Sequence, residues 1–498
     1  MTQIDKRFSE SWKKLPWKKF RKNLFGLQKR LYAAVGRGDK KTARKLQKLI
    51  LRSWSAIWLA IRQVTQLNRG KKTAGIDGKA KLSFAERFRL SEVLRKGVFR
   101  WKHELLREIA IPKKDGTQRI LKVPTIRDRA WQCLVKYALE PIHEVSFHQH
   151  SYGFRPGRSC HDAHKKIFHH LRSQSKGYEK RILELDIEKC FDRIDHQFLL
   201  QQVELPHAIK RGLKTCLKAG INPQFPEQGT CQGGVISPLL ANIALNGIEM
   251  IHNCVRYADD LVFILKPSDH AEAILQKVEQ FLAKRGLNIK QSKTKLVTAQ
   301  QGFDFLGWNF RVQSNQKFRS RPSQENFLAF RAKVKSVLHN SHYGASVKAQ
   351  KLGAIVRGWR NYHRYCCMDG SRFSLWHLRS RAAKIFRKER KQDRVSTQKL
   401  LTLAFPCVSY RENQHINVRG NKSPFDGDFL YWSKRNSKFY DGLTARLLRK
   451  QNHSCARCGL YFDTTESVQV HHVDGQHHNW NPDNLVAIHT SCHHFVHM

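Results

Sequence analysis

The sequence contains no long hydrophobic run, no internal repeat and no low-complexity tract. No apolar stretch approaches the ~18 to 20 residues that a membrane-spanning helix requires, so we expect no membrane span. The opening segment, MTQIDKRFSESWKKLPWKK, also lacks the apolar centre of a secretory signal. These absences predict a cytoplasmic protein, either of the bacterial cytosol or of an organelle interior.

Acidic residues are scarce. Asp and Glu number 40 against 91 Lys and Arg, which gives a net charge of +51 across 498 residues. This excess is far larger than solubility requires and predicts a polyanionic partner, most simply nucleic acid bound through its phosphates. A basic protein of the membrane surface is the alternative. A chain of this length exceeds a single hydrophobic core and should form two or more domains.

A cytosolic protein rarely carries a disulfide framework, so we do not expect the 12 cysteines to form one. Nine of the 12 cysteines are scattered singly or form the adjacent pair Cys366–Cys367, as expected of buried apolar residues. The other three lie in the last 48 residues, together with nine of the 26 histidines. This shift in composition predicts a separate small module at the end of the chain.

Hydrophobic periodicity divides the rest of the chain into segments. Residues 18–66 are very basic, with apolar residues recurring every three or four positions, which is typical of amphipathic helices. Short β-prone runs alternate with helical patterns over 108–310, and a basic helical pattern returns over 317–390. Residues 391–445 carry more turn signals. We therefore predict an α+β multidomain fold.

Acidic residues interrupt two apolar, β-prone runs. Asp259 and Asp260 lie inside CVRYADDLVFIL, which reads as strand, tight turn and strand, and Asp186 ends the run RILELD. If the strands are neighbours, Asp186 and Asp259 converge and repel unless divalent cations bridge them. Mg²⁺ prefers such oxygen ligands, and a pair of such ions serves nucleotidyl transfer. The alternative is an ordinary hairpin turn, whose backbone Asp tolerates.

The string Tyr257-Ala258-Asp259-Asp260 resembles the active-site box of reverse transcriptases, in the form typical of group II intron-encoded proteins. Other blocks follow that family's order. IPKKDGTQRILKVPTIRDRAWQ and SYGFRPGRSCHDA resemble its fingers blocks, LDIEKCFDRIDH carries the first catalytic Asp, and GTCQGGVISPLLANIALN resembles the template- and nucleotide-contacting block. The resemblance continues into WKKLPWKKFRKNLFGLQKRLY near the start and VRGWRNYHRY in the thumb, so it covers nearly the whole chain.

The resemblance implies a right-hand polymerase with fingers, palm and α-helical thumb, and it implies roles for the matching residues. Asp186 and Asp259 would hold two Mg²⁺ ions, with Asp260 beside them. Phe191 would be the steric gate that excludes the ribose 2′-hydroxyl and so selects dNTPs. The further expected nucleotide contacts are Lys113 and Arg119 at the triphosphate, Gln232 and Gly233 beneath the nucleotide, and Lys293 as the acid that protonates pyrophosphate.

Simpler interpretations exist for each of these residues. Phe191 can be a core residue, and a lone Lys or Arg can be a solvated surface charge. Cys231 replaces the Pro that is common in the family before the Gln-Gly pair, and we expect little effect, because that position contributes backbone shape. The catalytic positions are intact, which argues against a degenerate maturase that acts in splicing alone.

Aromatic residues are interleaved with Lys and Arg in both basic helical segments, a combination that suits phosphates and stacked unpaired bases of folded RNA. The alternative for each aromatic residue is core packing. The residues concerned are Trp12, Trp17 and Phe20 in the N-terminal segment and Arg357, Trp359, Arg360, Tyr362 and Tyr365 in the thumb.

Two ligand pairs in the last 48 residues have the spacing of a zinc site. Cys455 and Cys458 form a CxxC pair, and His489 and Cys492 are spaced in the same way. Together they predict a Cys₃His site with structural Zn²⁺ that stabilises a module too small for its own core. A purely structural zinc finger that uses four of these residues is the alternative to an enzyme.

The order VQVHHVDG, NPDNLVAIH and CHHFVH resembles the ββα-metal (HNH) nuclease module that many group II intron proteins carry at this end. The resemblance implies that His472 is the general base, that Asn484 orients His472 or the backbone, and that His477 and His478 are loop residues. His489 stands where the family often has Cys, a change that zinc tolerates. The implied ligands of one divalent ion are His471, His493 and His497.

We therefore predict a group II intron-encoded reverse transcriptase that assists splicing, binds intron RNA as a ribonucleoprotein, nicks double-stranded target DNA and extends the nicked end with dNTPs, associating with the nucleoid when it acts on DNA. A reverse transcriptase of a defence or diversity-generating element and a mainly RNA-binding maturase are the alternatives. The predicted domains are an RNA-binding extension (1–80), fingers and palm (81–310), thumb or maturase domain (311–395), DNA-binding linker (396–445) and HNH endonuclease (446–498).

Overall fold

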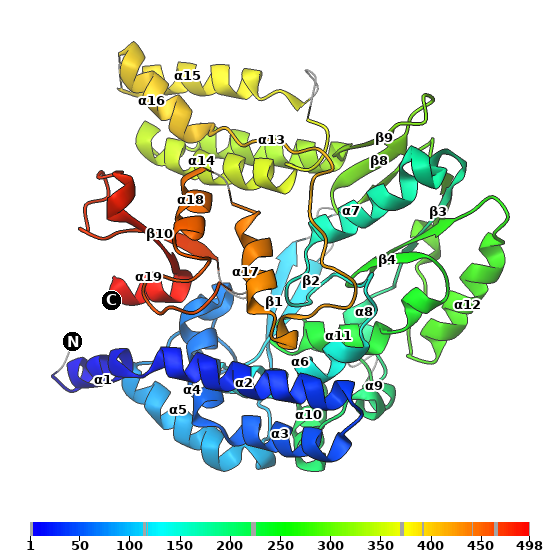
Figure 1. Ribbon diagram of the computed structural model, residues 1–498, viewed down its shortest axis with the longest axis vertical. Helices are drawn as coiled ribbons and strands as arrows, with labels where there is room; N and C mark the ends of the chain where they lie inside the picture. The colour runs from blue at the N-terminus through cyan, green and yellow to red at the C-terminus, as the bar shows by residue number, and fades with distance from the viewer. Residues whose placement is uncertain are drawn as a thin grey trace.

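The computed structural model describes residues 3–112, 116, 118–220, 226–368, 373–390, 393–440, 442–462 and 467–497. Helices and strands both contribute, as predicted. Figure 1 shows the N-terminal helices at the bottom, the helices of residues 324–404 at the top, the palm strands between them on the right and the C-terminal module on the left. Within the described residues, no helix is both long enough and apolar enough to cross a bilayer.

The N-terminal part is helical because apolar residues recur at helical spacing and polar side chains cap the helix starts. Asp39 accepts the backbone N–H of Thr42 at 2.9 Å, and Ser83 and Glu86 form a capping box. This part shares one hydrophobic core with the fingers and palm. The helices are α1 (Gln3–Lys14), α2 (Trp17–Gly36), α3 (Lys40–Arg52), α4 (Trp54–Arg62) and α5 (Phe84–Gly97).

The fingers begin with a two-stranded antiparallel hairpin, which is followed by a long buried helix. Thr125 caps that helix by accepting the N–H of Asp128 at 3.2 Å. Its apolar residues face the N-terminal helices on one side and the palm on the other. The elements are β1 (Arg107–Pro112), β2 (Gln118–Val123), α6 (Ile126–Ser146) and α7 (Cys160–Leu171).

The palm is a four-stranded antiparallel sheet in the order β4-β5-β3-β6. The middle strands are buried on both faces, which explains why their sequences are nearly continuous apolar runs. The strands are β3 (Arg181–Asp186), β4 (Cys254–Tyr257), β5 (Asp260–Leu265) and β6 (Lys295–Thr298). The helices of this region are α8 (Cys190–Arg193), α9 (His196–Gln202), α10 (His207–Lys218), α11 (Ser237–Leu245) and α12 (Ala271–Ala283).

A second antiparallel sheet, β7-β8-β9, joins the palm to four thumb helices. The thumb helices have their own apolar core, which extends to Phe405. The predicted boundary at residue 395 therefore falls inside a helix of the thumb. The elements are β7 (Phe303–Phe305), β8 (Trp308–Val312), β9 (Phe318–Pro322), α13 (Gln324–His339), α14 (Ala345–Tyr362), α15 (Trp376–Arg390) and α16 (Arg394–Ala404).

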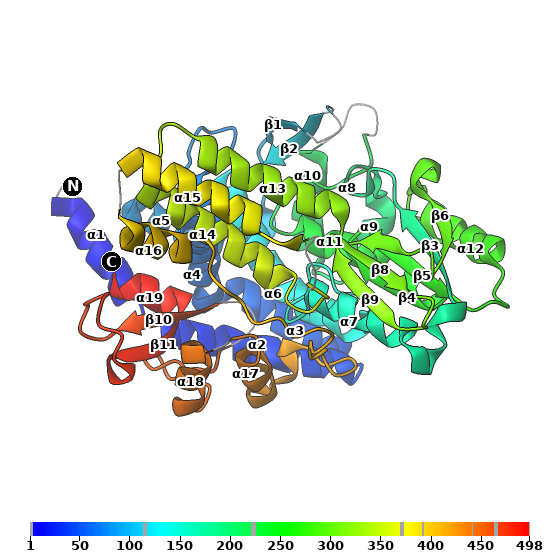
Figure 2. The same ribbon diagram turned by 90° about the horizontal axis from the view of Figure 1, so that it is seen from above.

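The C-terminal part crosses back toward the N-terminal helices. Seen from above, it lies beside α2 and α4 (Figure 2). A small core of its own contains Cys455, Cys458 and Cys492. Its elements are α17 (Phe429–Ser437), α18 (Gly442–Lys450), β10 (Val468–His472), β11 (Leu485–His489) and α19 (Thr490–Val496), with β10 and β11 antiparallel.

Candidate functional site

The three acidic residues meet at one end of the palm sheet. Asp186 ends β3 and is directly opposite Asp260, the first residue of β5. Tyr257 also pairs with Asp260, so Ala258 and Asp259 form a two-residue turn. Ala258 has a φ of 60°, the positive value that the first position of a type II′ hairpin turn requires. The strands are neighbours, which is the condition under which Asp186 and Asp259 were expected to converge.

The acids repel one another, and a lysine lies beside them. Burial by surrounding protein atoms, together with the charges of Asp259 and Asp186, raises the pKa of Asp260 to about 6, although part of its side chain reaches solvent. Lys293 Nζ lies 2.8 Å from Asp186 Oδ2. Among the described residues, these carboxylates are not gathered as tightly as the Cys and His sets of the C-terminal module. Their hard oxygen atoms are the donors that Mg²⁺ prefers.

A fully buried arginine holds the turn. Arg256 donates to Glu249 Oε1 at 2.5 Å, Asn242 Oδ1 at 2.9 Å and Ser151 Oγ at 2.6 Å. It also donates to the carbonyl oxygen of Ala258 at 3.0 Å, which fixes the backbone next to Asp259. A charge without water is costly unless it is paired in this way. The network therefore ties the acidic turn to the strand before it and to α11.

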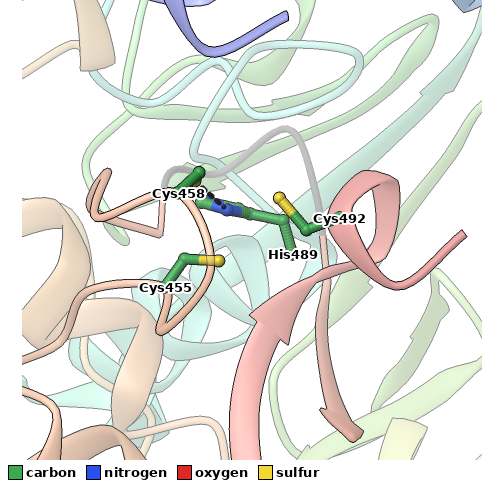
Figure 3. A group of neighbouring side chains, drawn as sticks. All are labelled: Cys455, Cys458, His489 and Cys492. Carbon is green, nitrogen blue, oxygen red and sulfur yellow. Dashed lines mark hydrogen bonds between the residues drawn. The ribbon is translucent and has the colours of Figure 1, made fainter. Parts of the chain in front are cut away.

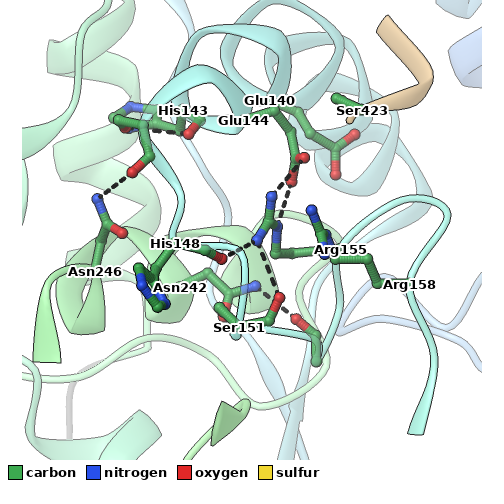
Figure 4. A network of polar contacts seen from close by, with 12 residues as sticks. Glu140, His143, Glu144, His148, Ser151, Arg155, Arg158, Asn242, Asn246 and Ser423 are labelled. Carbon is green, nitrogen blue, oxygen red and sulfur yellow. Dashed lines mark hydrogen bonds and ion pairs between the residues drawn. The ribbon is translucent and has the colours of Figure 1, made fainter. Parts of the chain in front are cut away.

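The segment that precedes α7 packs directly on the same turn. A Cβ atom on Gly153 would lie 2.3 Å from the backbone nitrogen of Ala258, so only glycine allows this approach. Arg155 anchors the segment through a bidentate pair with Glu144 of α6 at 2.9 and 3.0 Å and through the carbonyl oxygen of Ser151 at 3.0 Å (Figure 4). The block around Gly153 thus positions the hairpin that carries Asp259 and Asp260.

Sequence reasoning missed Gly153 and Arg256 as contributors to the site. The signal for Arg256 was its position inside an apolar strand, where a charge requires a partner. No comparable signal marked Gly153, because its importance depends on a contact with a turn that lies about one hundred residues away in the chain.

The predicted gate lies near the acidic cluster, because burial and then the charge of Asp259 raise the pKa of the thiol of Cys190, the residue before Phe191. Phe191, in α8, is half-buried, and its ring lies 6.3 Å from that of Phe154 in an edge-on arrangement.

Gln232 of the predicted nucleotide loop donates to the carboxylate of Asp192 at 3.2 Å, and its carbonyl oxygen accepts the N–H of Lys122 at 3.0 Å. These contacts connect the loop to both the palm and the fingers strand β2.

Gly233 has a φ of 134°, and a Cβ atom there would lie 2.9 Å from the carbonyl oxygen of Lys122. The loop therefore requires glycine at this point for both conformation and space. Lys113 lies outside the described residues. Arg119 pairs with Ile111 in the β1–β2 hairpin, but its side chain lies outside the described part of the structure.

The predicted zinc ligands converge. One ligand atom each from Cys455, Cys458, His489 and Cys492 lies within 4.8 Å of the others. Figure 3 shows the two cysteines of the loop facing the residues from β11 and α19. His489 Nδ1 lies 3.4 Å from Cys458 Sγ, while its Nε2 donates to the carbonyl oxygen of Tyr461 at 3.2 Å. That hydrogen bond leaves Nδ1 directed at the centre of the group.

A second group lies in the same module. The ligand atoms of His471, His493 and His497 also lie within 4.8 Å of one another. Burial and neighbouring imidazoles lower the pKa of His471 and of His493, so both rings are neutral near pH 7, the form that binds a cation. The donor set therefore suits a divalent transition metal.

The predicted base is adjacent to this group on β10. His472 is buried, and its Nε2 has no hydrogen-bond partner among the described residues. Asn484 holds the backbone after β10, because its Oδ1 accepts the N–H of Asp474 at 3.0 Å and its carbonyl oxygen accepts that of Val473 at 2.9 Å. His477, which we predicted to be only a loop residue, has its ring 5.4 Å from that of His472.

Most of the aromatic residues proposed to stack on RNA are instead packed inside the protein. Trp12, Trp17, Trp359 and Tyr365 are buried. Tyr362 is half-buried and stacks on Trp308 with a centroid separation of 4.4 Å. The interpretation of these side chains as base-stacking platforms is therefore wrong, and the core-packing alternative explains them. The exposed charges around them, such as Arg357, remain available to phosphates.

Three families match this chain. Residues 111–310 match "Reverse transcriptase (RNA-dependent DNA polymerase)", residues 12–94 match "N-terminal domain of reverse transcriptase", and residues 328–402 match "Group II intron, maturase-specific domain". All three matched segments precede the C-terminal module. The assignment of its Cys and His groups as metal sites is therefore supported only by the positions of their ligand atoms.

Curated relatives are consistent with these families. "Maturase-like protein 1" of Euglena gracilis is 38% identical over 80% of this chain and 89% of the relative. "Protein YkfC" of Escherichia coli K12 is 30% identical over 53% of this chain and 82% of the relative. "Group II intron-encoded protein LtrA" of Lactococcus lactis subsp. cremoris is 35% identical over 36% of this chain and 31% of the relative.

Proposed function

This chain belongs to the group II intron maturase and reverse transcriptase family, and from that premise we propose that Asp186, Asp259 and Asp260 form its polymerase active site. The chain has the reverse transcriptase and maturase-specific segments of that family. The observation that supports the assignment is the register of the palm, which places Asp186 opposite Asp260 and Asp259 in the adjoining turn. The polymer copied would be the intron RNA that the maturase segment helps to splice.

The residues at this site suit a two-metal nucleotidyl transfer. Two bound Mg²⁺ ions supply the charge that activates the primer 3′-hydroxyl and stabilises the leaving pyrophosphate. Asp186 and Asp259 would hold them. Burial and the acidic neighbours raise the pKa of Asp260 to about 6, so its negative charge is unfavourable unless a cation lies nearby. Lys293, whose Nζ lies 2.8 Å from Asp186 Oδ2, would donate a proton to pyrophosphate.

The other predicted site residues of the palm and fingers would bind the dNTP. The ring of Phe191 would exclude a ribose 2′-hydroxyl, and the backbone of Gln232 and Gly233 would lie beneath the nucleotide. Arg119 and Lys113 would bind the triphosphate from the fingers hairpin.

Primer extension tests this assignment. Wild-type protein should extend a DNA primer on an RNA template with Mg²⁺ and dNTPs, and Asp259→Ala should lose this activity by several orders of magnitude while its circular dichroism stays unchanged. The matched control is His472→Ala, which alters the other proposed site and should extend normally. Extension by Asp259→Ala at the wild-type rate would remove Asp259 from the reaction.

We also propose that the C-terminal module is an HNH-type endonuclease that nicks target DNA to provide the primer, and that the Cys₃His group binds structural Zn²⁺. The supporting observation is the convergence of His471, His493 and His497 next to His472. A divalent ion bound there stabilises charge on the scissile phosphate. His472 Nε2, which has no partner among the described residues, would accept the proton of the attacking water.

Strand-specific nicking tests the nuclease separately. His472→Ala should abolish nicking of the primer strand, whereas extension of a primer on pre-nicked DNA should persist. His478→Ala is a matched control, because this exposed histidine belongs to the second HH pair of the module. Nicking by His472→Ala at the wild-type rate would exclude His472 as the base.

A further inference from the structure

Helix α2 of the N-terminal region lies against the Cys₃His group, although more than 400 residues separate them in the chain. Arg21 Nη2 donates to Cys458 Sγ at 3.2 Å and to Cys492 Sγ at 3.6 Å. One guanidinium nitrogen thus spans two of the three sulfurs from outside the module. Both views place α19 near the beginning of α2 (Figures 1 and 2).

The chemistry of the group explains why a cation is placed there. Cysteine binds zinc as the thiolate, so three thiolates and one neutral imidazole around Zn²⁺ carry a net negative charge. The guanidinium of Arg21 is always protonated, and hydrogen bonds from it to anionic sulfur are charge-assisted. Partners of this kind fix the orientation of ligands and stabilise their charged form.

Other contacts continue the same interface. Arg62 of α4 is buried and donates to the carbonyl oxygen of Ser491, the residue before Cys492, at 3.1 Å. The ring of Phe25 on α2 lies 4.6 Å from that of Phe429. The ring of Phe429 in turn lies 6.3 Å from that of Tyr461, whose carbonyl oxygen holds His489. The contact therefore extends along α2 and includes apolar surface.

We propose that Arg21 is a positioning residue for the Cys₃His site, and that filling of this site fastens the C-terminal module to the N-terminal helices. The inference rests on the proposed zinc site and goes beyond it. Zinc would do more than stabilise a small fold. Because zinc keeps the cysteines as thiolates, it would also maintain the negative charge that Arg21 binds. The module would then stay docked against the reverse transcriptase body when zinc is present and loosen when zinc is lost.

Zinc release from the full-length protein tests the role of Arg21. The zinc-loaded protein is mixed with 4-(2-pyridylazo)resorcinol, and release is followed by absorbance. Arg21→Gln should release zinc about tenfold faster or more, in line with the usual effect of removing such partners. Arg21→Lys keeps the charge without the planar fork and should lie between Arg21→Gln and wild type. Arg30→Gln, an exposed arginine of the same helix, should match wild type.

Hydrogen exchange tests the docking without any substitution. Removal of zinc from wild type with a chelator should increase exchange in α2 around Arg21 as well as in residues 455–461. Zinc release by Arg21→Gln at the wild-type rate, or unchanged protection of α2 on zinc removal, would overturn the proposal. If wild type retains no zinc after metal loading, the proposed zinc site itself is wrong. This outcome is distinct from the two results that would overturn the role of Arg21.

Discussion

At the scale of single residues, the position of the acidic turn depends on the absence of a side chain at Gly153. Gly153 lies so close to Ala258 that a methyl group would overlap its backbone nitrogen at 2.3 Å. The contact involves backbone on both sides, so a rotamer change cannot relieve it. We predict that Gly153→Ala displaces the turn that carries Asp259 and lowers the rate of primer extension by about 100-fold, because misplacement of a reacting group by 1 Å costs that much.

A matched glycine substitution separates this effect from a general loss of stability. Gly26 lies inside α2, and a Cβ atom there meets nothing within 4 Å. Gly26→Ala should retain extension activity and raise the free energy of unfolding by about 0.5–1 kcal/mol, as expected for alanine in a helix interior. If Gly153→Ala extends primers as fast as Gly26→Ala, the close approach does not position Asp259.

Phe191 gives a second prediction at this scale. Its ring is half-buried and packs edge-on against Phe154, so it has a defined position next to the acidic cluster. Phe191→Ala should reduce discrimination against ribonucleotides at least about tenfold, because the steric barrier to a 2′-hydroxyl is removed. The measurement compares kcat/KM for dNTP and rNTP. Phe191→Tyr keeps the aromatic plate and should retain selectivity, and equal selectivity in all three proteins would contradict the gate.

At the scale of elements, three histidines lie where α7, the β7-β8-β9 sheet and α14 meet, and all but the half-buried His161 are buried. The rings of His161 and His164 lie 5.6 and 5.1 Å from that of Trp308, and His363 lies 5.7 Å from it. Burial lowers the pKa of His161 to about 4 and of His363 to about 3, and it lowers that of His164 well below 6.5. The junction between palm and thumb is therefore built on neutral imidazoles.

This junction should weaken in mild acid. An unfolded histidine takes up a proton near pH 6.5, whereas these buried histidines do so only at lower pH. Below pH 6.5 the unfolded chain binds more protons, so stability falls as pH decreases toward the lowered pKa values. Thermal melting between pH 7 and 5 should show a falling midpoint. His363→Gln, whose amide can replace the donor to Asn326, should show a shallower slope, and exposed His342→Gln should keep the wild-type slope.

The elements were predictable to the extent that their signals are local. The strands around Asp259 and the turn between them follow from an apolar run interrupted by acids. The pairing of β3 with β5 was only the condition under which the carboxylates would converge, and the structure supplies it. The CxxC spacing likewise indicated a group that the structure assembles. Residues that act across the fold, such as Gly153, Arg256 and Arg21, have no local signal that reveals their partners.

The burial of the aromatic residues in the basic helices could not be predicted from the sequence. A sequence cannot separate an aromatic side chain that faces RNA from one that faces a core when charges surround both. Trp12 and Trp359 are buried because their helices pack against neighbours whose positions depend on the whole fold. The net charge of the chain predicts that it binds a polyanion, but burial decides which side chains can contact that polyanion.

At the scale of the whole molecule, a buried carboxylate connects the reverse transcriptase body to the segment that leads to the C-terminal module. Asp162 of α7 accepts hydrogen bonds from Arg435 at 2.7 Å, His415 at 3.1 Å and the backbone of Val418 at 3.2 Å. Burial opposes the charge of Asp162, but the hydrogen bond from His415 and the charge of Arg435 hold its pKa below the usual range. This buried ionic group is thus one part of the attachment, beside contacts such as the hydrogen bond from Arg435 to the carbonyl oxygen of Gly157 at 3.0 Å.

Removal of that group should loosen the attachment. Asp162→Asn leaves the buried Arg435 without its counter-charge, and such a loss costs about 3–5 kcal/mol. Limited proteolysis should therefore cut the segment between α16 and α17 faster, and the thermal midpoint should fall. Asp428→Asn breaks an exposed pair with Lys422 and should change neither. The double variant Asp162→Asn, Arg435→Gln should recover part of the loss, and additive losses in that variant would show that the two side chains do not act as a pair.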